Sequence, residues 1–264
     1  MRYAQTLRVV NCLKWLVIVL AALYVFIVSV SAANGVFAQL HSIKSSDFDI
    51  PVPALFALAA FVACVIGSRF GRSLSEENED HLPVAWTLPS SRTRTLLTIM
   101  SVDGLGILAT IAIYLALSAL LIVTFGVTKY VVLPADTPIE LARYIIEPFA
   151  FYALLMALTA STGRAGRGLV GWYWVGGVFL GLLAASPFIP NPWHAIFNVI
   201  DFINPLAYGS YSSNGGHVSV VVNGSTQALT YVGTLTPAMD VVALLTLFAV
   251  GMTLALIQWR RLEA

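Results

Sequence analysis

Charge is scarce in this chain. Asp, Glu, Lys and Arg together make up 10% of its 264 residues, against about 25% in soluble domains. Hydrophobic residues make up 58%, and the mean hydropathy is +0.84. A surface with so few charges is unsuited to water, so the composition excludes a soluble globular domain and predicts an integral membrane protein.

Cysteine and clustered basic residues are also rare. Cys12 and Cys64 are the two cysteines, one near the amino terminus and one inside an apolar run. They provide no disulfide framework and indicate no redox compartment. The net charge is +1, and the basic residues stand singly or in pairs, which excludes the basic patch of a nucleic-acid-binding protein.

Motifs of catalytic and nucleotide-binding sites are missing. The glycine-rich segment 163–168 lacks the lysine and the preceding strand of a phosphate-binding loop. The sequence has no H-E-x-x-H, no Cys/His cluster and no G-x-S-x-G. We therefore expect no catalytic residue, metal site or cofactor in this chain. An intramembrane enzyme built on Glu76 and Glu77 is an alternative, but no intramembrane histidine completes such a site.

Long apolar runs dominate what is present. A bilayer-crossing helix needs about 20 apolar residues, and six runs approach or exceed this length: 15–37, 52–68, 101–127, 144–161, 168–187 and 237–258. Backbone polar groups inside lipid must bond within their own segment, and the alternating strands of a barrel are absent. The sequence predicts an all-α membrane protein of six transmembrane helices in a single domain, residues 1–264.

Basic residues in the connecting segments predict the orientation, because Lys and Arg are retained on the cytoplasmic side. With the amino terminus inside, the outer segments hold only Lys44, Lys129 and Arg143. The inner segments hold Arg2, Arg8, Lys14, Arg69, Arg72, Arg92, Arg94, Arg164, Arg167, Arg260 and Arg261. We expect a multi-pass protein of the plasma (inner) membrane with both termini cytoplasmic. Residues 1–14 form either an amphipathic interfacial helix or a basic flank that only fixes topology.

The predicted cytoplasmic segment 69–95 combines acidic residues with a short apolar stretch. Glu76 and Glu77 precede Leu82 and Trp86, and Pro89 ends the stretch. Proline suits the start or the end of a helix, so this segment predicts a short helix with apolar surface for a protein partner or the lipid interface. A solvated loop that only fixes orientation is the alternative.

This segment resembles the inner loop of permease subunits of ABC-2 type transporters. The resemblance rests on Glu77, Asp80-His81-Leu82, Ala85-Trp86-Thr87 and Pro89-Ser90-Ser91-Arg92. The chain departs from the usual pattern at Asp80, where glycine is common, and at Pro83, where an acidic residue is common. The resemblance implies a coupling helix that contacts a separate ATP-binding cassette subunit, which would hold ATP and Mg. The residues that it assigns to coupling are Glu76, Glu77, Leu82, Trp86, Pro89 and Arg92.

The predicted extracytoplasmic segment 187–236 has two halves. The first alternates apolar residues with Asn and Pro, which predicts re-entrant helices, and its end at Asn204, Pro205 and Tyr208 resembles the family's element at the exit of the pathway. The second half predicts a small β-hairpin, because Asn223-Gly224 separates two β-prone runs. This hairpin is either a surface loop without a role in transport or a gate for the substrate.

Carboxylates and glycines within the spans are further candidates. Glu147 is a candidate for the pathway or gate, because intramembrane carboxylates are costly. Snorkelling or a preference for helix starts is the alternative for Glu147, Asp103 and Asp240. Gly177 and Gly181 form a G-x-x-x-G pattern, which predicts either a dimer interface with a second permease subunit or packing within one chain.

The resemblance and the pattern of spans together predict half of an ATP-driven exporter, as a homodimer or heterodimer. The ATPase activity is expected in the partner, so the chain itself is not an enzyme. A non-transporting scaffold or sensor subunit that docks a cytoplasmic partner is the alternative. The cargo is not encoded in any recognisable motif.

Overall fold

A computed structural model of the chain describes five helices and four short strands. The residues described are 50–72, 92–124, 131–133, 137–161, 166–185, 203–205, 217–222, 225–230 and 237–261, together with Val10, Lys14, Ile18, Ala21, Gly126, Thr128 and Ile196. The helices are α2 (Val52–Phe70), α5 (Arg92–Thr124), α6 (Thr137–Thr159), α7 (Gly166–Ala185) and α9 (Pro237–Arg261).

Three of these helices are long and apolar enough to cross a membrane. The apolar stretches are Leu96–Thr124 in α5, Pro138–Thr159 in α6 and Ala238–Trp259 in α9, and α2 and α7 contain the shorter stretches Leu55–Phe70 and Gly168–Phe179. The described part of the chain therefore has the helical, apolar character of a membrane protein. Of the expected first span, 15–37, the structure describes Ile18 and Ala21 alone, so the count of six spans remains a prediction.

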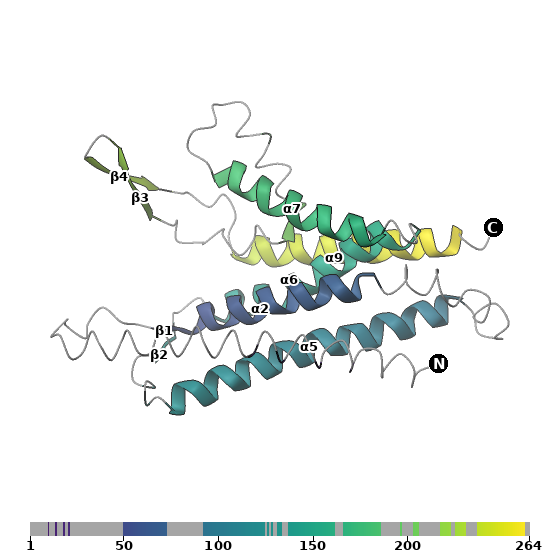
Figure 1. The fold of residues 1–264 in the computed structure, drawn as a ribbon, viewed down its shortest axis with the longest axis horizontal. Helices are drawn as coiled ribbons and strands as arrows, with labels where there is room; N and C mark the ends of the chain where they lie inside the picture. Colours follow the sequence, from purple (N-terminus) through teal and green to yellow (C-terminus); the bar gives the residue numbers. More distant parts are fainter. Residues whose placement is uncertain are drawn as a thin grey trace.

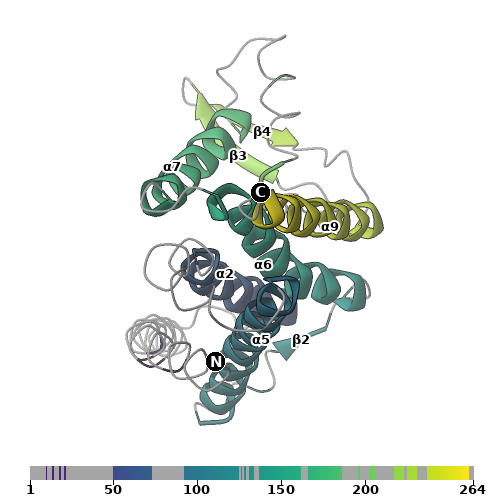
Figure 2. The ribbon, with the colours of Figure 1, turned by 90° about the vertical axis from the view of Figure 1, so that its right-hand side faces the viewer.

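Helix α6 occupies the centre of the bundle (Figures 1 and 2). It packs against α9 on one side and α2 on the other, with α5 and α7 completing its surroundings. Most of its carboxyl-terminal half, including Phe151, Tyr152, Leu155 and Met156, is buried. The main apolar core lies between α2, α5, α6 and α9.

The order of contacts along the helices shows that α6 and α9 run parallel. Arg143 pairs with Asp240 near the starts of the two helices, and Gly251 meets Ala153 further along both. In Figure 1, α2 runs in this direction as well, and α5 and α7 run in the opposite direction. The five helices therefore alternate in direction along the chain.

Close backbone approaches at glycines bring the helices together. A Cβ added to Gly251 would lie 2.7 Å from the carbonyl carbon of Ala153, and one added to Gly71 would lie 2.7 Å from the Cβ of Leu155. The Thr159 hydroxyl also donates a hydrogen bond to the carbonyl oxygen of Gly71, at 2.5 Å. Small residues at such contacts let helix backbones approach closely where lipid surrounds them.

The outer faces of the bundle are apolar. Large side chains that are mostly exposed include Leu105 and Leu120 of α5, Trp172 and Phe179 of α7, and Val242 of α9. Such continuous apolar surface fits lipid or a membrane-embedded partner and is unsuited to water. This agrees with the composition of the chain.

The fourth expected span, 144–161, was placed too late in the sequence. Helix α6 starts at Thr137, with Pro138 in its first turn and Glu140 as an early acidic residue, which are features of a helix start. Arg143, which we assigned to an outer loop, thus lies within the helix. Likewise α5 starts at Arg92, nine residues before the expected 101.

Two small sheets complete the described structure. Strands β1 (Ile50–Pro51) and β2 (Val131–Val132) pair in parallel beside the start of α2. Strands β3 (His217–Val222) and β4 (Ser225–Thr230) pair antiparallel, with His217 opposite Thr230 and Val222 opposite Ser225. The predicted turn, Asn223-Gly224, lies outside the described residues, so the complete hairpin stays a prediction.

Candidate functional site

A cluster of buried charged side chains joins α6 to α9 near the starts of both helices. Nη1 of Arg143 lies 3.6 Å from Oδ2 of Asp240, and the two side chains are 2% and 1% exposed. The guanidinium carbon of Arg143 also lies 4.6 Å from the centre of the Tyr144 ring. A cation between a carboxylate and an aromatic face is stabilised by both.

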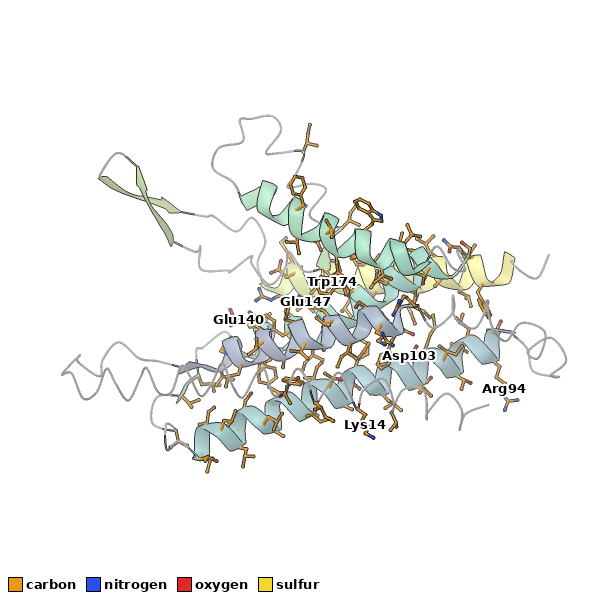
Figure 3. The ribbon with its side chains drawn as sticks, in the orientation of Figure 1. Lys14, Arg94, Asp103, Glu140, Glu147 and Trp174 are labelled. Atoms are coloured by element: carbon orange, nitrogen blue, oxygen red, sulfur yellow. The ribbon has the colours of Figure 1, made fainter. Side chains whose placement is uncertain are left out.

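Glu147 is the third charged member of this cluster. It follows Arg143 by four residues and therefore lies on the same face of α6. Its side chain is only 5% exposed, and it interacts electrostatically with the Arg143 guanidinium and with the thiol of Cys64 on α2. Figure 3 shows Glu147 between the helices and Glu140 nearer the end of the bundle. We call Arg143, Glu147 and Asp240 the charge cluster.

A second buried carboxylate, Asp103, lies in the other half of the bundle (Figure 3). Asp103 is 1% exposed, and the Tyr152 hydroxyl of α6 donates a hydrogen bond to its Oδ2 at 3.1 Å. Burial of all three carboxylates rules out snorkelling to the interface. The preference for a helix start does hold for Asp240, which lies in the first turn of α9.

Substitution of Tyr152 by phenylalanine should destabilise the protein by about 1–3 kcal/mol, the usual cost of leaving a buried hydrogen-bonding group without its partner. The measurement is unfolding by a denaturing detergent in mixed micelles. In an Asp103→Leu background the acceptor is gone, so Tyr152→Phe should cost nothing. An equal cost in both backgrounds would contradict a role for this hydrogen bond.

Asn204, in the described segment 203–205, forms a hydrogen bond to α7. Its Nδ2 donates a hydrogen bond to the carbonyl oxygen of Gly177 at 3.1 Å, and Asn204 and Pro205 are both buried. A Cβ on Gly177 would lie 3.2 Å from Oδ1 of Asn204. One candidate for the dimer interface thus contacts one candidate for the gate, so for Gly177 the structure favours packing within one chain.

The structure describes only some of the other site residues that the sequence predicted. Arg92 is the first residue of α5 and Gly181 lies in α7. Tyr208 and five of the coupling residues lie outside the described residues: Glu76, Glu77, Leu82, Trp86 and Pro89. Within the described ranges, Glu147 is the candidate that the structure places in a charged environment.

Arg143 and Asp240 are the site residues that the sequence did not pair. Arg143 follows Glu140 by three residues and precedes Glu147 by four, and this helical spacing was the available signal. Among the described residues, no group of three His, Cys, Asp or Glu side chains is placed to hold a metal ion.

Comparison of the chain with protein-family models, with curated proteins and with solved structures finds no match.

Proposed function

We propose that this chain is the transmembrane subunit of an ATP-driven exporter of the ABC-2 type. In this proposal six helices cross the membrane, both termini are cytoplasmic, and a second permease subunit completes the pathway. A separate ATP-binding cassette subunit supplies ATP hydrolysis. The segment 187–236 lies on the extracytoplasmic side, where its first half re-enters the membrane and its hairpin lies outside it.

The alternating direction of the described helices supports repeated membrane crossing. Helices α2, α6 and α9 run one way, and α5 and α7 run back between them (Figure 1). A chain can place three parallel helices side by side only if it returns between them. Crossing a bilayer back and forth produces this arrangement.

The clustering of basic residues at one end of the bundle is the observation that carries the proposal. The end of α2, the starts of α5 and α7 and the end of α9 lie toward the same side in Figure 1. The basic residues in or next to these helix ends are Arg69, Arg72, Arg92, Arg94, Arg167, Arg260 and Arg261. By the positive-inside rule this end faces the cytoplasm, and it is the end at which residues 73–91 connect α2 to α5.

That connection is the segment that resembles the coupling helix. We expect Glu77→Ala combined with Trp86→Ala to weaken binding of the ATP-binding subunit by about 30-fold or more, because an exposed Trp at a protein interface contributes about 2 kcal/mol or more. Co-purification in lipid and the rate of stimulated ATP hydrolysis measure the effect.

The matched control removes the same residue types elsewhere. Glu140 is partly buried in the first turn of α6, and Trp172 of α7 is 74% exposed. The double variant Glu140→Ala, Trp172→Ala should bind and stimulate the ATPase as wild type does. If no ATP-binding subunit associates with the wild-type chain, the proposal of an exporter is wrong, and a scaffold or sensor subunit becomes the better interpretation.

A further inference from the structure

The charge cluster contains more acid than base. One guanidinium, of Arg143, faces two carboxylates, of Glu147 and Asp240, and none of the three side chains is more than 5% exposed. With every group ionised the cluster would bury one uncompensated negative charge. An isolated ion in an apolar environment costs far more than a neutral group, and the usual response is that the group becomes neutral.

The geometry indicates which carboxyl is in excess. Arg143 forms its ion pair with Asp240, which compensates one charge of each sign. Glu147 then remains, with Arg143 already paired, and two neutral groups lie near it in the described part of the chain. Those neighbours are the buried Cys64 thiol of α2 and, one turn along α6, Phe151, which contacts Tyr173 of α7 with ring centres 5.3 Å apart.

The surroundings of Asp240 show that its charge depends on Arg143. The distance of 3.6 Å between Arg143 and Asp240 is longer than a hydrogen bond. Both carboxylate oxygens of Asp240 are buried and accept no hydrogen bond from the described residues. Buried acceptors normally have a donor, so Asp240 depends on the Arg143 guanidinium to compensate its charge.

We propose that the charge cluster is a proton-binding site, which holds one proton on Glu147 while this side chain is buried in the helix bundle. Binding forms an O–H bond between a proton from water and a Glu147 carboxylate oxygen, and no electrons are exchanged. The cluster is then neutral. Release needs water to reach Glu147, so the proton leaves only when the packing around this buried side chain opens. The inference is independent of the ATP-binding partner, and its test contains no ATPase.

Infrared spectroscopy of the purified full chain in lipid tests the proposal, because a protonated carboxyl has its own C=O stretching band. At about pH 7 an exposed carboxylate is ionised, so the band reports a buried acid. We expect the wild type to show it, and isotopic labelling of glutamate to shift it. Because Asp103 is a second buried carboxyl, a band that moves with labelled aspartate reports on that residue; the absence of any component that moves with labelled glutamate would overturn the proposal.

Three variants test the count of charges. Glu147→Gln and Asp240→Asn each leave one acid for one base, so both should lose the component of the band that moves with labelled glutamate. Glu140→Gln removes a glutamate two turns earlier on the same helix and should keep it. A glutamate component that persists in Glu147→Gln would show that the proton is bound elsewhere.

Stability should also depend on pH in a defined direction. The folded chain holds a proton that the unfolded chain releases above the pH at which an exposed glutamate ionises, so a rise in pH favours unfolding. The unfolding constant should increase about tenfold per pH unit while the folded chain keeps its proton. Glu147→Gln should remove this slope and Glu140→Gln should keep it. An unchanged slope in Glu147→Gln would contradict the proposal.

Discussion

Substitution of Arg143 by methionine is expected to lower the free energy of unfolding by about 3–5 kcal/mol, the cost of leaving a buried charge without its partner. Asp240 is 1% exposed and has its ion pair with Arg143. Methionine keeps much of the volume of the arginine stem, so the loss reports mainly on charge. Unfolding by a denaturing detergent in mixed micelles measures it.

The double variant Arg143→Met, Asp240→Asn is the control for this interpretation. It removes the cation and its ion-pair partner together, and replacing both members of a buried pair by neutral groups is often close to neutral. We expect it to recover most of the stability that Arg143→Met loses. A double variant as unstable as the sum of the two single variants would mean that the two side chains act independently.

Substitution of Gly251 is the second change with a large expected effect. A Cβ at this position would lie 2.7 to 2.9 Å from three backbone atoms of Ala153 and Leu154. Backbone atoms in a helix cannot rotate away as a side chain can, so α9 must shift from α6. Overpacking costs about 1–3 kcal/mol; we expect Gly251→Ala to fall in this range and Gly251→Val to exceed it.

Gly176 provides the comparison for Gly251. A Cβ at Gly176 in α7 would meet nothing within 4 Å. Gly176→Ala should therefore leave the protein unchanged or stabilise it by up to about 1 kcal/mol through helix propensity. If both alanine variants unfold like wild type in mixed micelles, the close contact between α6 and α9 does not contribute to stability.

Apolar run length predicted where helices lie better than where they begin. Each of the five described helices falls on an expected span. The starts of α5 and α6 were missed because their first turns hold polar or charged residues, such as Arg94 and Glu140. Run length treats any such residue as the edge of a span. A charged residue can lie inside a helix when another helix compensates it.

The candidate site was predictable only in part, for the same reason. Glu147 was recognisable as a carboxylate within a span. Its cluster with Arg143 and Asp240 depends on the packing of α6 against α9, whose residues are nearly one hundred positions apart. Similarly, Asp103 has its tyrosine donor on another helix. Such pairings arise from tertiary structure and leave no local pattern in the sequence.

The parallel course of α6 and α9 also determines how their peptide dipoles act on the two acids. Each helix presents the positive end of its dipole at its amino terminus, and the effect fades beyond the first turn. Asp240 is in the first turn of α9, where a negative charge is favoured. Glu147 is the eleventh residue of α6, which begins at Thr137, and is beyond this influence. Asp240 is therefore the carboxyl group that stays ionised, and Glu147 is the carboxyl group that is protonated.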